Sequence, residues 1–281
     1  MKLSMSLFSV ARTRYADTII AFSFCAFSFL TAAPSGAQEA DVTIRKKARS
    51  QNPTLCLSAF DGPGKMEALL RATLGHAGWF RLVDRPGSAT YVLSAACSTA
   101  PPRALELKVE TGGRTAAHFR QIASSDRPNW LVYQAVDRLI EKLFETPGPC
   151  ASRIAFTVGS DAAREVFTMN FDGSHARQVT HNGSISTEPD WAPGAASLVY
   201  TFYDTTRTSL VLADLRRQRQ RRLTRNPGLN ASGAISPDGA RIAFAMSRDN
   251  QVDLYVMTIA DRGLKRLTRG DAVESSPCWS P

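Results

Sequence analysis

The side chains most often used in catalysis are scattered along this chain without the spacing that a catalytic site requires. No histidine has a partner at metal-ligand spacing. No Gly-x-Ser-x-Gly turn presents a serine nucleophile, and no glycine-rich loop follows a strand where it would cradle phosphate. The sequence therefore predicts no catalytic residue, no metal ligand and no cofactor, and we expect the chain not to be an enzyme. The histidines are His76, His118, His175 and His181.

One acidic turn, Asn170–Gly173, alternates side-chain oxygens in the manner of a calcium loop. The chain repeats itself every 44 positions in this region, and the counterpart of Asp172 in the next repeat is Arg216, which offers no oxygen. An Asp-Gly pair between two strands is typical of a type I′ hairpin turn. We therefore interpret Asp172-Gly173 as a turn of this type and not as a calcium site.

The basic run Arg216–Arg222 raises the question of nucleic-acid binding, and the whole chain has a net charge of +9. No aromatic residues are interleaved with these arginines, so bases would have nothing to stack on. The repeat register places the run in the loop between the third and fourth strands of a unit. We therefore predict a solvated hairpin and no nucleic-acid partner. The alternative is contact with an acidic protein or an anionic envelope surface.

The elements that position these residues come in three copies of a 44-residue unit between Arg153 and Pro281. Each copy holds short β-branched or aromatic runs, separated by turn residues such as Pro237-Asp238-Gly239. A period of about 40 to 45 residues with four short strands is typical of a β-propeller blade. The repeated runs are Arg153–Phe156, Ser197–Tyr200 and Arg241–Phe244; Val166–Met169, Leu210–Ala213 and Leu254–Met257; Gln178–Thr180, Arg222–Thr224 and Arg266–Thr268; and Trp191–Pro193, Ile235–Pro237 and Trp279–Pro281.

Three repeats are too few to close a ring, because propellers have about four to eight blades. Either the product stops early, or two or more copies complete a ring, or further sequence follows; we favour the first. The first unit begins with its second strand at Arg153. The segment Pro277–Pro281 is therefore either the first strand of that unit or the start of a further blade. An open arc leaves sheet edges for self-association.

Residues 1–37 have the pattern of a secretory signal peptide. Three basic residues precede an uncharged stretch from Thr18 to Leu30, and Ser35–Ala37 offers small residues for cleavage before Gln38. The apolar stretch is shorter than the roughly 20 residues that span a membrane. We therefore expect an exported chain without a transmembrane segment after cleavage.

Four cysteines remain after that cleavage, and in an oxidising compartment they pair in one of three ways. We favour the pair Cys56–Cys97, because both residues fall in predicted strands; the alternative is that they are small buried residues. The other two are Cys150 and Cys278.

Residues 38–147 read as a small α/β domain, and residues 148–281 as the partial propeller. The domain ends at Pro147-Gly148-Pro149, which no helix can cross. The fold class is thus α+β followed by all-β. The predicted strands are Thr54–Phe60, Tyr91–Cys97 and a run around Leu105, Leu107 and Val109; the predicted helices are Lys65–His76, stopped by Gly78, and a second one after the Ser125-Asp126 cap and Pro128.

Taken together, these features resemble the TolB family of the Tol-Pal envelope system of Gram-negative bacteria. The likeness covers the chain from Glu39 to Pro281. It is carried by Leu74–Phe80, by Asn129-Trp130-Leu131 with Asp137 and Glu141-Lys142-Leu143, by Ser152–Phe156, and by Ser236–Gly239 followed by Ile242–Phe244 and Leu254–Met257. Members of the family close a six-bladed ring, and this sequence departs from that pattern because it holds three repeats.

The resemblance implies two partner-binding segments. In the family, a short segment at the mature N-terminus binds the inner-membrane-anchored TolA, and its alternating pattern here suits strand addition; the matching residues are Glu39, Asp41, Val42 and Ile44. Loops before each Trp-Ser-Pro type strand form the face that receives Pal, the peptidoglycan-associated lipoprotein; the matching residues are Thr187, Glu188, Leu229, Asn230, Ser232, Glu274, Ser275 and Ser276.

The resemblance therefore implies a non-enzymatic periplasmic scaffold that supports outer-membrane integrity and cell division. A rival interpretation is the propeller of a prolyl-oligopeptidase-like hydrolase, which requires a Ser-His-Asp domain that this sequence does not contain. A third is a truncated product without function.

Overall fold

The computed structural model describes residues 9–12, 52–125 and 127–280, with the backbone alone for residues 9–12. Two compact units divide the chain between Ala151 and Ser152. The N-terminal unit holds the described residues 52–151. The repeat unit holds residues 152–280 together with residues 9–12.

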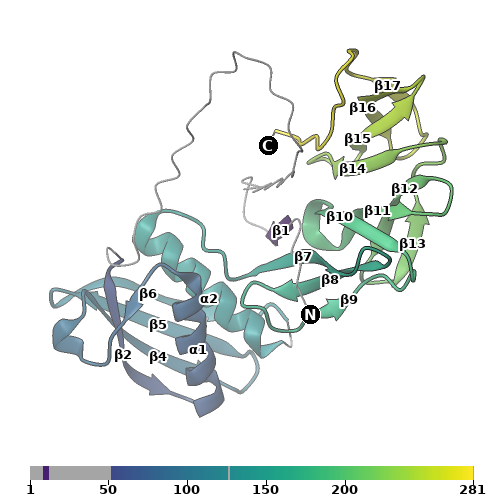
Figure 1. The fold of residues 1–281 in the computed structure, drawn as a ribbon. Helices are drawn as coiled ribbons and strands as arrows, with labels where there is room; N and C mark the ends of the chain where they lie inside the picture. The colour runs from purple at the N-terminus through teal and green to yellow at the C-terminus, as the bar shows by residue number, and fades with distance from the viewer. Residues whose placement is uncertain (1–8, 13–51, 126, 281) are drawn as a thin grey trace. The chain divides into compact units, whose positions relative to one another are not determined.

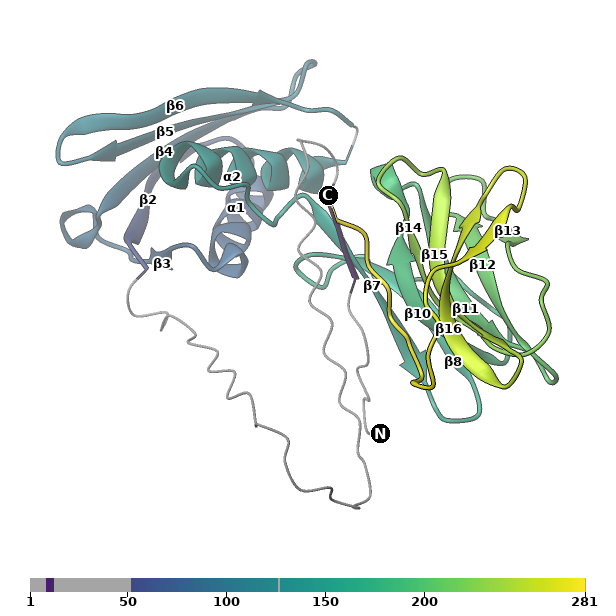
Figure 2. The ribbon, with the colours of Figure 1, turned by 90° about the horizontal axis from the view of Figure 1, so that it is seen from above.

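The N-terminal unit is a five-stranded sheet with the order β3-β2-β4-β5-β6 and two helices. Strand β2 runs parallel to β3 and β4, whereas β4, β5 and β6 form an antiparallel meander. Both helices lie on the same face of the sheet (Figures 1 and 2). The elements are β2 (Thr54–Asp61), α1 (Gly64–Ala77), β3 (Arg81–Leu82), the 3-10 turn η2 (Pro86–Ser88), β4 (Tyr91–Ser98), β5 (Ala104–Thr111), β6 (Arg114–Ile122) and α2 (Pro128–Phe144).

The two helices begin and end where the sequence supplies the local signals. Gly78 ends α1 in the left-handed conformation, at φ 73°, which glycine adopts without steric cost. Helix α2 starts with Pro128 in its first turn, but the predicted cap is wrong: Arg127 occupies the N-cap position and makes no side-chain cap hydrogen bond. The buried face of α2 includes Val136, Leu139 and Ile140, which have the expected helical spacing.

The favoured Cys56–Cys97 pair is wrong, because the structure joins neither residue in a disulfide. Cys56 lies opposite Val92 in the parallel β2–β4 pair, five residues short of Cys97 along β4. At about 3.3 Å per residue this is roughly 16 Å, whereas a disulfide needs Cα atoms within about 7 Å. Cys56 and Cys150 are buried, as the alternative of small packed residues predicts.

The repeat unit consists of three groups of antiparallel strands, and within the repeats the strands follow the order that the 44-residue period predicts (Figure 2). We call β1, β7, β8 and β9 repeat sheet 1, β10 to β13 repeat sheet 2, and β14 to β17 repeat sheet 3. A single parallel bridge between Arg164 of β8 and Ile185 of β10 joins sheets 1 and 2 into one eight-stranded sheet. In each repeat sheet the first strand (β1, β10 or β14) is called innermost and the last (β9, β13 or β17) outermost. The bounds are β1 (Ser9–Arg12), β7 (Ser152–Gly159), β8 (Arg164–Asn170), β9 (Arg177–Gln178), β10 (Ile185–Trp191), the 3-10 turn η3 (Pro193–Ala195), β11 (Ser197–Tyr203), β12 (Thr208–Asp214), β13 (Arg219–Arg222), β14 (Asn230–Ile235), β15 (Arg241–Arg248), β16 (Gln251–Thr258) and β17 (Leu264–Arg266).

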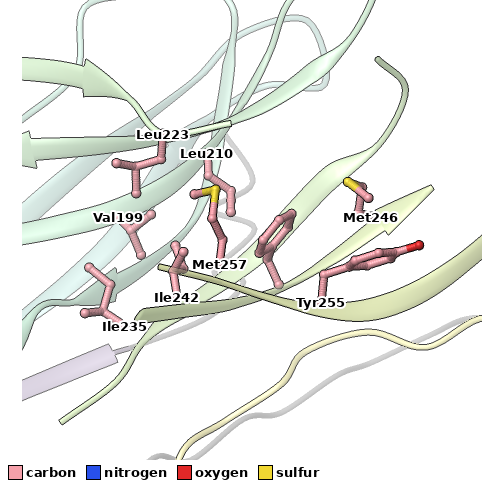
Figure 3. Packing of buried hydrophobic residues seen from close by; sticks show 9 residues of the cluster. Val199, Leu210, Leu223, Ile235, Ile242, Met246, Tyr255 and Met257 are labelled. Atoms are coloured by element: carbon pink, nitrogen blue, oxygen red, sulfur yellow. The ribbon is translucent and has the colours of Figure 1, made fainter. Parts of the chain in front are cut away.

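Apolar side chains fill the space between repeat sheets 2 and 3 (Figure 3). Val199, Leu210 and Leu223 come from sheet 2, and Ile242 and Met257 face them from sheet 3. All of these side chains are nearly or fully buried. The sheets are therefore held together by face-to-face burial of apolar residues, which is what a propeller-like stack requires.

The threonine that ends each Arg-Leu-Thr run has the same structural role in all three repeats. Its Oγ1 accepts a hydrogen bond from a backbone N–H of the third strand, 14 residues earlier. The bonds are Val166 to Thr180 at 2.8 Å, Leu210 to Thr224 at 2.9 Å and Leu254 to Thr268 at 2.9 Å. The threonine hydroxyl thus accepts an N–H of the third strand just beyond the last backbone pair with the outermost strand. This N–H would otherwise lack an acceptor, which explains why threonine recurs at this position.

Two predicted turns need correction. Of the pair Asp172-Gly173, only the glycine has a positive φ, at 83°, so the turn is not type I′, which needs positive φ at both positions. The Asp172 carboxylate accepts the Ser174 N–H at 3.0 Å. The basic run Arg216–Arg222 was predicted to lie in a loop. Only its first residues lie in the turn, because Arg219–Arg222 form strand β13.

Candidate functional site: the end of the repeat sheets where the innermost strands begin

Most of the residues predicted to bind a partner lie at one end of the repeat sheets. Ile185 pairs with Tyr203, and Asn230 pairs with Met246, so β10 and β14 begin beside the ends of β11 and β15. The Glu274 N–H donates to the Val252 carbonyl at 3.1 Å, which brings the segment Glu274–Ser276 to the same end of the sheets. The sequence placed these residues in loops. The structure instead places Thr187, Glu188, Asn230 and Ser232 within β10 and β14.

Glu188 links repeat sheets 2 and 3. Its carboxylate accepts the Thr201 hydroxyl at 2.7 Å, the Ser232 N–H at 2.8 Å and the Ser232 hydroxyl at 3.1 Å. Glu188, Ser232 and Ser276 are 44 residues apart and share the left-handed conformation, with φ of 53°, 53° and 54°. The strands β10 and β14 therefore bulge at the same position, and at Ser232 this bulge turns a backbone N–H toward the preceding sheet.

Asn230 is a fully buried residue, with 0% of its surface exposed. Its amide donates to the carbonyls of Asn226 at 2.9 Å and of Thr208 at 3.2 Å, and its own N–H bonds the Thr208 hydroxyl. These contacts tie the loop before β14 to the start of β12. Asn230 positions this end of the sheets from within.

The remaining predicted residues are more accessible. Thr187, Leu229 and Glu274 are half-buried, whereas Ser275 and Ser276 are exposed. One further residue at this end was missed by the sequence reasoning. Tyr203 is half-buried beside Thr187, and its pKa is raised by burial and by the negative charge of Glu188. Tyr203 ends β11, and no local sequence pattern marks it as a site residue. Its position beside β10 follows only from the register between the two strands.

A hollow of about 600 Å³ opens beside this end of the sheets. Its wall is formed by the loop before β14, by the end of β15 and by the turn that follows it. The lining residues are Asn226, Pro227, Gly228, Met246, Ser247, Arg248, Asp249 and Asn250, with Leu264.

The predicted TolA-binding residues Glu39, Asp41, Val42 and Ile44 lie outside the described residues, as does most of the predicted signal peptide. Within that peptide, residues 9–12 form strand β1 and pair with β7.

The basic run lies at the opposite end and along the outermost strand of repeat sheet 2. Arg217 pairs with Asp214 at 3.1 Å, and Arg222 lies 3.7 Å from Asp204 and over the Phe202 ring. Arg216, Arg219 and Arg221 are exposed. Part of the positive charge is thus compensated within the sheet.

The described part of the chain contains no group of three or more His, Cys, Asp or Glu side chains that would hold a metal ion. His118 lies 2.6 Å from Glu106, and both side chains are about half exposed on the open face of the N-terminal sheet. Within the same residues, no helix is both long and apolar enough to cross a membrane.

A pair of equivalent contacts, each made by an arginine and a tryptophan, joins one repeat to the next. The Arg153 guanidinium lies 4.6 Å from the Trp191 ring centroid, and Arg241 lies 4.8 Å from that of Trp279. Both members of the second pair lie 88 residues after those of the first. At the equivalent positions of the next contact, Ser197 replaces the arginine and Ile235 replaces the tryptophan. The cation and the aromatic ring are therefore lost together.

Comparison with known proteins agrees with this architecture. Residues 140–281 match the family model described as TolB beta propeller domain. The Tol-Pal system protein TolB of Anaeromyxobacter dehalogenans strain 2CP-1 is 33% identical over 173 residues, which are 61% of this chain and 39% of that protein. TolB of Desulfosudis oleivorans is 30% identical over 131 residues, which are 47% of this chain and 30% of that protein.

Among solved structures, the crystal structure of TolB from Acinetobacter baumannii superposes with a TM-score of 0.72 at 19% sequence identity, over 80% of this chain and 62% of that one. At this identity the match establishes a shared fold. The chain spans less than two thirds of the length of these TolB proteins. Because the family model covers half of the sequence, the chain belongs to the TolB family and carries its β-propeller domain over residues 140–281.

Proposed function

We propose that this chain is a non-enzymatic periplasmic scaffold of the Tol-Pal system, which binds a Pal-like lipoprotein and a TolA-like protein of the inner membrane. The observation that carries the proposal is the match of residues 140–281 to the TolB propeller domain, in a chain whose similar relatives are named Tol-Pal system proteins. The role in outer-membrane integrity and cell division follows from that system. Export by cleavage before Gln38 belongs to the same proposal.

The end of the sheets where β10 and β14 begin is the proposed Pal-binding surface. Side chains that accept or donate hydrogen bonds gather there around Thr187, Tyr203, Ser275 and Ser276, and the adjoining hollow gives a partner's side chain room to enter. Glu188 and Asn230 support this surface by holding the first residues of β10 and β14 in place through hydrogen bonds. Direct hydrogen bonds are a regular part of protein interfaces, about one for every 100–200 Å².

The second proposed surface is the segment Glu39–Ile44, which binds the TolA-like protein by strand addition. Val42 and Ile44 alternate with polar neighbours, so one face of the added strand would present apolar side chains, while its backbone would bond to the edge of the partner's sheet.

Titration calorimetry of the exported chain against each partner domain tests this function. We expect binding of both domains at micromolar concentration. Thr187→Arg should weaken binding of the Pal-like domain alone, and Val42→Lys should weaken binding of the TolA-like domain alone. Gln218→Arg, in the exposed turn at the other end of repeat sheet 2, is the matched control and should change neither. Absence of binding to both domains would refute the proposal.

A further inference from the structure

The arginine-rich hairpin of repeat sheet 2 takes no part in the partner binding proposed above, and most of its charge is uncompensated. Between Asp214 and Arg225 the sequence holds six arginines and one acidic residue. Arg217 pairs with Asp214, and Arg222 lies near Asp204. Three exposed arginines of the hairpin form no ion pair within the described part of the chain. We call these three residues, Arg216, Arg219 and Arg221, the arginine edge.

The arginine edge lies along the border of repeat sheet 2. Strand β13 ends the strand order there, and among the described residues it pairs with β12 alone (Figure 1). Arg219 and Arg221 are two residues apart on β13, so their side chains project from the same face, with Cα atoms about 7 Å apart. Arg216 lies in the turn that leads into this strand. The three guanidinium groups therefore line one exposed border of the sheet.

Folding of the hairpin does not require arginine in its turn. The residues equivalent to Arg216 are Asp172 in the preceding repeat and Ala260 in the following one. The third and outermost strands pair in both of those repeats. Charged side chains on an edge strand also oppose pairing with the edge of another sheet, but Arg216 lies outside β13 and does not serve that purpose. The positive charge is therefore an addition to the repeat and not a condition of its fold.

The surroundings of the arginine edge favour a membrane surface as its partner over a protein or a nucleic acid. The centre of a protein interface is apolar, and the exposed large apolar side chains of the described residues lie outside repeat sheet 2. No aromatic residue is interleaved with the arginines to stack on a base. A guanidinium group binds phosphate through two parallel hydrogen bonds. A membrane offers many phosphates and requires no apolar anchor.

We propose that the arginine edge binds the phosphate headgroups of anionic phospholipids and holds repeat sheet 2 against a membrane surface. The contact is peripheral, because the guanidinium groups meet the headgroups and no apolar side chain of this border enters the hydrocarbon. A basic residue close to an anionic surface strengthens binding by about 1 kcal/mol, which is about fivefold. The inference goes beyond the proposed function, because it requires neither the Pal-like nor the TolA-like partner.

The test is co-sedimentation of the full chain, produced in a Gram-negative host, with vesicles of phosphatidylglycerol and phosphatidylethanolamine. Vesicles of phosphatidylcholine are the neutral control and should bind far less. Changing Arg219→Gln and Arg221→Gln together should weaken binding to the anionic vesicles about thirtyfold. The matched control, Arg81→Gln with Arg85→Gln, removes the same charge from exposed positions of the N-terminal unit and should change binding less than about twofold.

Two further measurements separate this contact from other causes. Arg219→Lys with Arg221→Lys keeps the charge and should retain most of the binding, and salt at about 1 M, where the Debye length is about 3 Å, should release the chain. The melting temperature should not change in any variant, because the substituted side chains are exposed. Equal binding to neutral and anionic vesicles, equal loss in the two glutamine variants, or binding to polyglutamate without binding to vesicles would overturn the proposal.

Discussion

At the scale of single residues, the repeat unit depends on a few buried or half-buried hydrogen bonds made by side chains. The threonine of each Arg-Leu-Thr run accepts a backbone N–H, and the carboxylate of Glu188 joins two sheets. A buried donor that loses its acceptor keeps the full cost of its desolvation. These positions should therefore be sensitive to changes that preserve shape and remove polarity.

Thr224→Val should destabilise the chain by about 1 to 3 kcal/mol, because it leaves the Leu210 N–H without an acceptor in a buried position. Thr206→Val, in the exposed turn before β12, is the matched control and should change the free energy of unfolding by less than about 0.5 kcal/mol. Urea unfolding followed by circular dichroism measures both. Equal effects would contradict the proposed role of the threonine.

Glu188 and Thr201 should be energetically coupled across their 2.7 Å hydrogen bond. In a double-mutant cycle with Glu188→Ala and Thr201→Val, we expect a coupling energy of about 0.5 to 3 kcal/mol, because each change removes one partner of the same contact. Urea unfolding of the four proteins measures it. A coupling energy of zero would show that Glu188 does not stabilise the strand start.

The turn Ser236–Gly239 should make stability depend on pH in the acid range. The Ser236 hydroxyl and the Ala240 N–H, helped by Arg241, hold the pKa of Asp238 below its usual value. The stability gained from this carboxylate is therefore present above its ordinary pKa of about 3.9 and is lost as pH falls through the lower folded value. Asp238→Asn should flatten the fall of the melting temperature between about pH 4 and pH 2. If the melting temperature of Asp238→Asn fell with pH as steeply as that of the unaltered chain, this role of Asp238 would be contradicted.

At the scale of elements, the strands were predictable where the 44-residue period repeats, because four apolar runs aligned without a gap. The predicted strands at Leu198–Tyr200 and Ile242–Phe244 are confirmed within β11 and β15. Strand β6 was missed because it lies outside the repeats and alternates with exposed charged residues. Burial of Asn230 and the position of Tyr203 also escaped prediction, because both depend on contacts between strands rather than on local sequence.

The segment that follows α2 is fixed by one carboxylate of that helix. Asp137 accepts the N–H groups of Cys150 and Ala151, both at 2.7 Å. A Cβ on Gly148 would lie 2.1 Å from the Asp137 Oδ1 and 2.6 Å from its Cα. The glycine is therefore required by close approach of the chain to the helix, which explains why glycine stands between two prolines here.

Gly148→Ala should destabilise the N-terminal unit by more than about 1 kcal/mol, because the helix and the following segment must separate to admit the methyl group. Gly75→Ala is the matched control: its Cβ would meet nothing closer than 3.9 Å within helix α1, and it should be neutral or stabilising by up to about 1 kcal/mol. Thermal unfolding measures both. A neutral Gly148→Ala would contradict the close approach.

At the scale of the whole molecule, the TolB family membership follows from the repeats, which are also the part of the sequence that was easiest to interpret. The arginine–tryptophan contacts between repeats were not predicted, since the middle repeat replaces both partners with Ser197 and Ile235. The proposed partner-binding surface depends on how the first residues of β10 and β14 come together at one end of the sheets. The sequence indicated the residues, and the register shows which of them are accessible.

The most direct test of the proposed scaffold is photocross-linking in living Gram-negative cells from a benzoylphenylalanine placed at position 187, beside Tyr203. The account predicts an adduct with a Pal-like outer-membrane lipoprotein, identified by mass spectrometry, and no such adduct from position 218 at the other end of the sheet. Adducts from both positions alike, or none from position 187 in a folded and exported chain, would contradict it.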